Sequence, residues 1–237
     1  MARNIAIQQA KAPLIAFLDA DDIWLAGKLQ RQIEFHQAKP ELSFSFTDYR
    51  HVGEHGEDRG TCFEFWPNYQ GLSRQQKGYQ LKADAAASLF AENVVGTSTV
   101  MASRTALLKC FAFDEQLPSA EDWDLWLKLA LLGPVGISNH VDCEYLMRDG
   151  SESSKSQLRI KAMHIIYQRY AQAVKQQSPK ALAQAKARIA TAEAELYNEQ
   201  SLRLSAIFSR VQALYYSPNR RRGIETLADT RNLLLLR

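Results

Sequence analysis

The chain has 237 residues, of which 46% are hydrophobic and 23% are charged, so its composition permits a packed core. A formal net charge of only +3, without a zinc-finger, helix-turn-helix or RNA-binding signature, argues against a nucleic-acid partner. The cysteines Cys62, Cys110 and Cys143 are scattered, which indicates reduced thiols in a cytoplasmic protein. No stretch reaches the ~18–20 apolar residues that a membrane span requires.

The first element in the chain is an apolar run from Leu14 to Leu18, which predicts a short buried strand that ends in Asp19, Asp21 and Asp22. In an open α/β sheet, ligands bind at the carboxyl ends of strands. Carboxylate oxygens there suit a hard divalent cation that is shared with the phosphates of a nucleotide. The alternative is that Asp21 or Asp22 caps the next helix, but a cap needs only one acid.

The middle of the chain alternates between predicted helices and strands. A helix is expected at 25–38, followed by a strand at 42–49. One face of that helix carries Leu25, Leu29, Ile33 and His36. Residues 50–80 are rich in glycine, charge and aromatic rings, and we favour a hairpin that covers the sheet over an acceptor loop. The remaining expected elements are helices at 83–91 and 104–110 and strands at 94–102, 134–137 and 141–147.

A second acidic segment begins a predicted helix near residue 121. Trp123, Trp126, Leu127 and Ala130 fall on one helical face. Glu121 and Asp122 then lie in the first turn, where acids interact favourably with the helix dipole and resemble a capping box with Ser119. A catalytic base would occupy the same place, because a helix that starts beside a cleft points its first turn at the ligand.

Beyond Ser156 the sequence becomes helical in character, and glycine is absent until Gly223. Helices are expected at about 156–176, 179–200 and 201–216. The basic run 220–222, with the apolar residues 233–236 nearby, suggests peripheral contact with an anionic membrane surface, although a solvated turn and a packed helix explain it more simply. Two regions are therefore expected, at 1–154 and at 155–237.

Taken in order, these segments resemble glycosyltransferase family 2, whose enzymes move a sugar from a nucleotide-sugar donor onto an acceptor hydroxyl. The resemblance covers roughly residues 2–154. It rests on Ala2-Arg3-Asn4, on 17–22, on Trp24 with Lys28-Leu29, and on 121–126. It implies an α/β fold, with a GT-A-like (Rossmann-like) nucleotide-diphospho-sugar transferase sheet in 1–154 and a C-terminal α-helical appendage in 155–237. It also implies inverting transfer to a saccharide or lipid-linked acceptor, in cell-surface polysaccharide or glycolipid synthesis, by a cytoplasmic protein at or near the inner face of the membrane.

The resemblance also assigns roles to individual residues. Asp19 and Asp21 match the Asp-x-Asp motif that contacts the donor and holds Mn²⁺ or Mg²⁺ on its diphosphate. Asp122 is similar to the family's general base. The remaining assignments are Arg3 and Asn4 beside the nucleotide, and Glu121, Thr97 and Ser98 on the acceptor side.

The chain departs from the family pattern in two places. The family's first strand, helix, second strand and glycine-rich turn have no counterpart before Arg3, so we expect an N-terminally truncated sheet with an exposed edge and weaker nucleotide binding. Near Tyr145 the family often shows an aromatic residue, Arg and then His; here Arg148 stands in the place of His. Arg148 is therefore expected either to bind a donor phosphate or to be an exposed loop residue.

Two other functions remain open. A nucleotidyltransferase also uses acids on a nucleotide-binding sheet, but it usually carries a glycine-rich basic loop that this chain lacks. A truncated, inactive nucleotide-sugar-binding or scaffold protein would be consistent with the expected lack of the family's N-terminal strands, whereas the presence of Asp19, Asp21 and Asp122 favours the enzyme.

Overall fold

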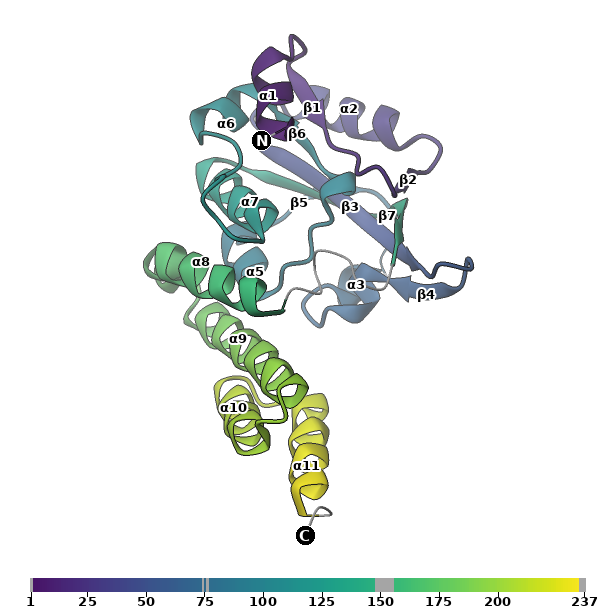
Figure 1. The fold of residues 1–237 in the computed structure, drawn as a ribbon. Coiled ribbons are helices and arrows are strands. Elements are labelled where there is room, and N and C mark those ends of the chain that lie inside the picture. Colours follow the sequence, from purple (N-terminus) through teal and green to yellow (C-terminus); the bar gives the residue numbers. More distant parts are fainter. Residues whose placement is uncertain (1, 74, 76, 148–155, 235–237) are drawn as a thin grey trace. The chain divides into compact units, whose positions relative to one another are not determined.

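A computed structural model describes residues 2–73, 75, 77–147 and 156–234 of the chain. The chain divides into two compact units (Figure 1). The first unit comprises residues 1–89, 93–117 and 121–151, and the second comprises 90–92, 118–120 and 152–237. Each unit is described by itself.

The first unit is built on a seven-stranded mixed sheet. Its strands are β1 (Leu14–Ala16), β2 (Ile23–Trp24), β3 (Phe44–Val52), β4 (Asp58–Thr61), β5 (Tyr79–Leu81), β6 (Met101–Ser103) and β7 (Val135–Leu146). The strand order is β1-β6-β3-β7-β2, with β4 paired to β3 and β5 paired to β7. Only β3 and β7 are parallel, and every other pair is antiparallel. The expected α/β class is thus confirmed.

Helices lie on both faces of this sheet. They are α1 (Ala2–Gln9), α2 (Lys28–Ala38), α3 (Cys62–Phe65), α4 (Gln70–Ser73), α5 (Ala85–Ala91), α6 (Arg104–Lys109) and α7 (Glu121–Leu132), with a 3₁₀ turn at Thr97–Thr99. Successive side chains of a strand point to opposite faces. Phe44 of β3 stacks on Trp126 of α7, with ring centroids 5.7 Å apart, whereas the next residue, Ser45, hydrogen-bonds to His36 of α2. Helices α2 and α7 therefore cover opposite faces of β3 (Figure 1).

The buried face of α2 is polar and shares only His36 with the mainly apolar face that its sequence suggested. Lys28, Gln32 and His36 are buried, while Leu29 and Ile33 are exposed. The sheet explains this choice, because it presents polar partners: Gln32 Nε2 donates to the Thr99 carbonyl at 3.0 Å, and His36 Nε2 lies 3.0 Å from Ser45 Oγ. The helix starts at Lys28, later than expected, after Gly27 in the left-handed region (φ 80°).

Three other expectations need correction or refinement. The strand expected at 94–102 is wrong in its first part, because Thr99 donates from its N–H and its hydroxyl to the Gly96 carbonyl (2.9 and 2.7 Å) and closes a 3₁₀ turn before β6. The two strands expected at 134–137 and 141–147 form one strand, β7. In the region 50–80, β3 and β4 form a hairpin, as favoured, but it extends the sheet rather than covers it, and α3 and α4 follow.

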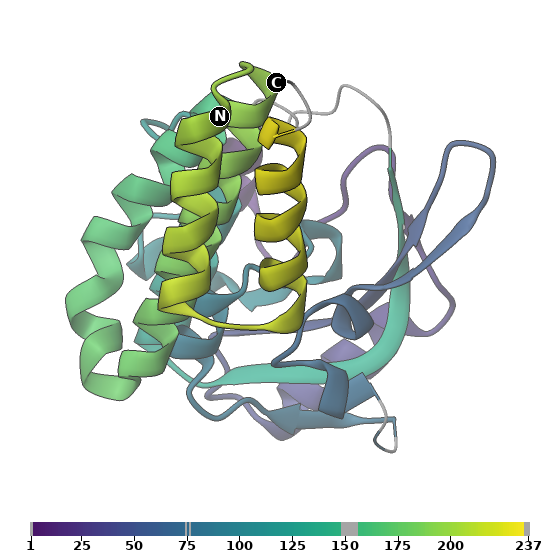
Figure 2. The same cartoon turned by 90° about the horizontal axis from the view of Figure 1, so that it is seen from below.

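The second unit contains the four helices α8 (Ser156–Gln177), α9 (Pro179–Glu199), α10 (Arg203–Tyr216) and α11 (Arg220–Leu234). Ser178 caps α9 by accepting from the Ala181 N–H at 3.3 Å, directly before Pro179. Arg210 of α10 forms ion pairs with Glu225 (2.9 Å) and Asp229 (3.1 Å) of α11. These two helices run side by side in Figure 2. Across the described residues, no helix is both long and apolar enough to cross a membrane.

Candidate active site

The acidic run 19–22 forms a turn directly after β1. The Asp22 N–H donates to the Asp19 carbonyl at 3.2 Å, which closes the turn. The three carboxylates then have different environments, since Asp21 is exposed, Asp19 is half-buried and Asp22 is buried. Burial raises the pKa of Asp22, and the nearby charges of Asp19 and Asp21 raise it further. Asp19 and Asp21 are therefore the accessible acids of this turn.

Ser98 holds the acidic turn in place. Its hydroxyl accepts from the Asp19 backbone N–H at 2.9 Å, and its carbonyl accepts from Trp24 Nε1 at 2.6 Å. A hydrogen bond from the same side chain lowers the pKa of Asp22 and so partly opposes the effect of burial. Ser98 and Thr97 are both buried. Their predicted place on the acceptor side stays a prediction. In this structure Ser98 is a buried residue that hydrogen-bonds to Asp19 and Asp22.

Arg3 connects the acidic turn with the start of α7. Its guanidinium is ion-paired with Asp19, and Nη1 lies 3.7 Å from Glu121 Oε1. It also lies over the ring of Phe113, 5.5 Å from the centroid. One cation therefore lies between acids that are more than a hundred positions apart in the chain.

Asn4, which neighbours Arg3 on α1, holds the segment that precedes α7. Asn4 Nδ2 donates to the Phe113 carbonyl and to Glu115 Oε1, both at 2.9 Å. Asn4 Oδ1 accepts from the Phe113 N–H at 3.0 Å. The amide thus makes contacts that position the loop beneath Arg3, and its predicted contact with a nucleotide stays a prediction.

Asp122 lies in the first turn of α7, as predicted. Ala120, the residue directly before this helix, has a left-handed backbone conformation (φ 56°). Oδ1 of Asp122 accepts from the Trp123 N–H at 2.7 Å. Burial raises the pKa of Asp122 to about 6; the Trp123 hydrogen bond lowers it, the charge of Glu121 raises it, and the charge of Arg3 lowers it. A carboxyl group with this pKa is largely ionised at neutral pH and is a stronger base than an ordinary carboxylate.

A divalent cation would find part of its ligand set here. Asp19 and Asp21 supply carboxylate oxygens, which Mg²⁺ and Mn²⁺ prefer. Among the described residues, no group of three or more His, Cys, Asp or Glu side chains is arranged to hold a metal. The residues thus fit a cation that takes its other ligands from a bound diphosphate and water, as Mg²⁺ usually does.

An aromatic cluster that sequence reasoning did not identify lies next to the acids. The rings of Tyr49, His51 and Tyr145 have centroids 5.0, 5.7 and 5.9 Å apart. They come from the carboxyl ends of the parallel strands β3 and β7, where His51 is opposite Tyr145. Burial raises the pKa of Tyr145, and the nearby negative charges of Asp22, Asp21, Asp19 and Asp122 raise it further.

This aromatic cluster had a detectable signal in the sequence. Two strands with aromatic residues near their carboxyl ends would bring those residues together if the strands were parallel neighbours, but the pairing of β3 with β7 cannot be read from either strand alone. Arg148, the predicted phosphate ligand, lies outside the described residues.

The chain is similar to known glycosyltransferases. Residues 1–93 match the sequence profile of Glycosyl transferase family 2. The chain is 32% identical over 128 residues to the UDP-Glc:alpha-D-GlcNAc-diphosphoundecaprenol beta-1,3-glucosyltransferase WfgD of Escherichia coli, covering 54% of this chain and 42% of that protein. It is 41% identical over 56 residues to the putative teichuronic acid biosynthesis glycosyltransferase TuaG of Bacillus subtilis (strain 168), covering 24% of this chain and 22% of that protein. The chain thus spans less than half the length of these relatives.

Proposed function

Because this chain belongs to glycosyltransferase family 2, we propose that it transfers a sugar from a nucleotide-diphosphate sugar to a hydroxyl group of a saccharide or lipid-linked acceptor. The process would be the synthesis of a cell-surface polysaccharide or glycolipid. The observation that carries the proposal is that Arg3 contacts both Asp19 of the acidic turn and Glu121, which directly precedes Asp122 on α7. Asp122 itself has a pKa of about 6.

In this proposal Asp122 is the general base. Its ionised carboxylate takes the proton of the acceptor hydroxyl while the acceptor oxygen bonds to the anomeric carbon of the donor sugar. The bond from that carbon to the nucleotide diphosphate breaks, and the diphosphate leaves with the electron pair. Attack from the side opposite the leaving group inverts the anomeric centre. Proton transfer to a positioned base contributes typically ~10²–10⁴-fold to such a reaction.

The acidic turn would bind the donor. Asp19 and Asp21 would hold Mn²⁺ or Mg²⁺, which supplies Lewis-acid stabilisation of the leaving diphosphate when it is bound. Asp21 is exposed and accessible to such an ion, whereas Asp19 is held by Arg3. Arg3 adds a second positive charge at the same place, and its guanidinium can turn from Asp19 toward a phosphate oxygen.

The aromatic cluster of Tyr49, His51 and Tyr145 would form one wall of the acceptor site. The ring of Tyr145 offers an apolar surface beside carboxylates, which suits a sugar because a sugar has apolar C–H faces and polar edges. The acidic turn lies close to Tyr145 in the sheet, because Ile23, the residue after Asp22, pairs with Glu144, the residue before Tyr145. An acceptor stacked there would lie within reach of Asp122.

The named relatives suggest which substrates to test first. Two Escherichia coli relatives are named as transferring glucose from UDP-glucose to GlcNAc-diphosphoundecaprenol; the second, WfaP, is 44% identical over 48 residues, covering 20% of this chain and 19% of that protein. A lipid-linked acceptor of this kind would place the chain in the cytoplasm, in peripheral contact with the membrane. The basic run suggested for that contact is partly engaged within its own unit, as Arg222 donates to the Ser217 carbonyl at 2.6 Å.

The test is a transfer assay with radiolabelled UDP-sugars, Mn²⁺ and a short-chain lipid-linked GlcNAc diphosphate. We expect transfer of label to the acceptor and release of UDP in equal amounts. Binding of UDP-sugar without transfer to any saccharide or lipid-linked acceptor would instead favour a binding protein. A product with retained anomeric configuration would contradict the inverting mechanism.

A further inference from the structure

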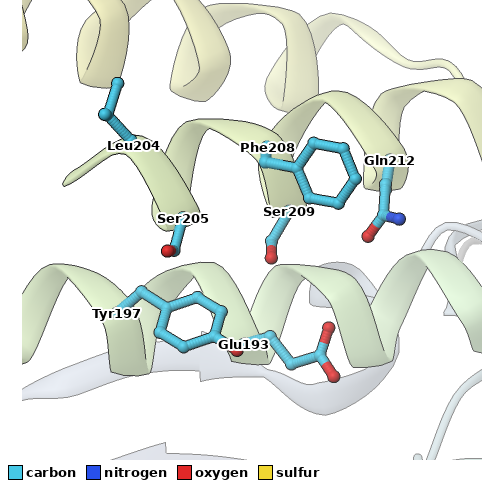
Figure 3. A pocket seen from close by; sticks show the side chains of 7 residues that line it. All are labelled: Glu193, Tyr197, Leu204, Ser205, Phe208, Ser209 and Gln212. Atoms are coloured by element: carbon cyan, nitrogen blue, oxygen red, sulfur yellow. The ribbon is translucent and has the colours of Figure 1, made fainter. Parts of the chain in front are cut away.

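Helix α10 carries a continuous apolar stripe on its exposed side. The stripe consists of Leu204, Phe208, Val211 and Tyr215, which are 73%, 64%, 50% and 83% exposed. Ser205 and Ser209 point toward α9, whereas Leu204 is directed away from it (Figure 3). The stripe borders an open groove of about 400 Å³, which Leu204, Phe208 and both serines line together with Gln212 of α10 and with Glu193 and Tyr197 of α9. Contacts with α9 and α11 therefore use the other sides of this helix and leave the stripe uncovered in the second unit.

The spacing of the stripe is that of a helix-pairing seam. Its members are four, three and four positions apart, which is the alternation that keeps apolar residues facing a partner helix. With these exposed fractions the stripe presents roughly 500 Å² per chain, since aromatic side chains alone carry about 150–250 Å² each. Monomeric proteins rarely expose a larger contiguous apolar patch. Two copies would bury about 1,000 Å², which is the lower limit for a specific interface.

The residues beside the stripe indicate which partner it fits. Its flanking positions are Ser205, Ile207, Gln212 and Leu214, and none of them is charged. A helix that lies on an anionic membrane carries Lys and Arg on its polar face. The polar face of α10 instead packs inside its unit, where Arg210 is ion-paired with Glu225 and Asp229. An uncharged, apolar stripe meets no repulsion from an identical stripe.

We propose that the α10 stripe is a self-association surface, through which two copies of the chain form a twofold antiparallel helix pair. A twofold axis that passes between Phe208 and Val211 places Phe208 of each copy opposite Val211 of the other. It likewise sets Leu204 of each copy against Tyr215 of the other. Such an isologous contact closes on itself and stops at a dimer. Interfaces near this lower limit are typical of weak, transient association, and we expect a dissociation constant on the order of 10–100 µM.

Analytical ultracentrifugation of the whole chain from about 1 µM to about 500 µM tests the proposal. We expect a monomer–dimer equilibrium that Phe208→Glu weakens at least about 10-fold. The matched control is Leu227→Glu, which places the same charge at an exposed leucine of α11 and should leave the equilibrium unchanged. Thermal melts should be similar for all three proteins, because both residues are exposed. A monomer throughout the range, or equal effects of the two substitutions, would overturn the proposal.

A charge swap tests the antiparallel arrangement and separates it from lipid binding. In an antiparallel pair, Ser205 of one copy lies beside Gln212 of the other. The double variant Ser205→Lys with Gln212→Glu should then tighten the dimer by about 3-fold through two new ion pairs, whereas Ser205→Lys with Gln212→Lys should weaken it. Equal effects of both variants would overturn the antiparallel geometry. Binding of the wild-type chain to anionic vesicles that Phe208→Glu abolishes, without dimerisation, would assign the stripe to a membrane instead.

Discussion

The guanidinium of Arg3 on α1 is ion-paired with the carboxylate of Asp19 on the turn after β1. In the proposed donor site, Arg3 thus engages one of the two carboxylates that a divalent ion would need as ligands. The pair is partly exposed, so it is screened by solvent and can be broken at modest cost. Arg3 and a metal ion would compete for Asp19, and a bound diphosphate would relieve the competition by accepting both positive charges.

Removal of this competing charge should strengthen the binding of metal alone. We expect Arg3→Gln to bind Mn²⁺ about 3- to 10-fold more tightly than the wild-type chain in the absence of nucleotide, because the pair is partly screened. Titration followed by electron paramagnetic resonance of free Mn²⁺ measures this. Arg50→Gln is the control, since Arg50 likewise pairs with a partly exposed carboxylate, that of Asp58. Unchanged Mn²⁺ affinity in Arg3→Gln would show that Asp19 is not a metal ligand.

Metal should in turn strengthen nucleotide binding through Asp21. Calorimetry should show UDP binding at least about 10-fold more tightly with Mn²⁺ than with EDTA, because the ion neutralises the diphosphate. Asp21→Ala should remove most of this difference, while Asp58→Ala, which removes another exposed carboxylate, should preserve it. Equal UDP affinity with Mn²⁺ and with EDTA would rule out the shared-metal site.

Loss of the aromatic wall should weaken the binding of the acceptor more than the binding of the donor. Tyr145→Ala should raise the acceptor KM by about 10-fold, as expected for the loss of one stacked ring in a binding site. Tyr145→Phe keeps the ring and should have a much smaller effect. Phe111→Ala removes an exposed ring elsewhere in the same unit and serves as the control. A donor KM that rises as much as the acceptor KM in Tyr145→Ala would argue against this wall.

Loss of the ion pair of the buried Asp142 carboxylate should destabilise the fold. The Asp142 side chain is fully buried and is ion-paired with Arg31, which is 33% exposed. Arg31→Met should lower the free energy of unfolding by about 1–3 kcal/mol, less than for a fully buried pair because solvent screens Arg31. Urea denaturation measures the change. Arg50→Met, which breaks an exposed pair, should cost less than about 1 kcal/mol; equal losses in both variants would contradict this account.

The sequence predicts the elements of the site better than their surroundings. The acidic turn after β1 and the acids in the first turn of α7 follow from local patterns of apolar and charged residues. The link between them does not, because the contacts of Arg3 with Asp19 and Glu121 depend on how α1 packs. Likewise, nothing local to Ser98 indicates that it supports Asp19 and Asp22.

Helix α2 shows why periodicity alone does not identify its buried face, of which it found only His36. Its apolar residues Leu29 and Ile33 fit a buried stripe, yet the sheet beneath offers Ser45 and the Thr99 carbonyl. Buried polar groups require hydrogen-bond partners, so Gln32 and His36 turn inward and the apolar residues face outward. The polar surface of β3 decides the orientation, and that surface is known only once the sheet is assembled.

The raised pKa of Asp122 has a consequence for stability. Because the folded state holds this proton up to about pH 6, above the ordinary carboxyl range, the group favours folding at low pH and loses that contribution as pH rises through 6. Asp122→Asn removes this partly buried charge and should melt at or above the temperature of the wild-type chain at pH 8. A clear drop in melting temperature at pH 8 would show that the ionised carboxylate stabilises α7.

The general-base role of Asp122 is tested most directly by the initial rate of sugar transfer in Asp122→Asn, measured beside donor binding. The amide keeps the size of the side chain and its acceptor oxygen for the Trp123 N–H, but it cannot take a proton. We predict a loss of transfer of at least ~10²-fold, with UDP-sugar affinity nearly unchanged, while the wild-type rate falls as pH drops through about 6. Near-normal transfer by Asp122→Asn would contradict the account.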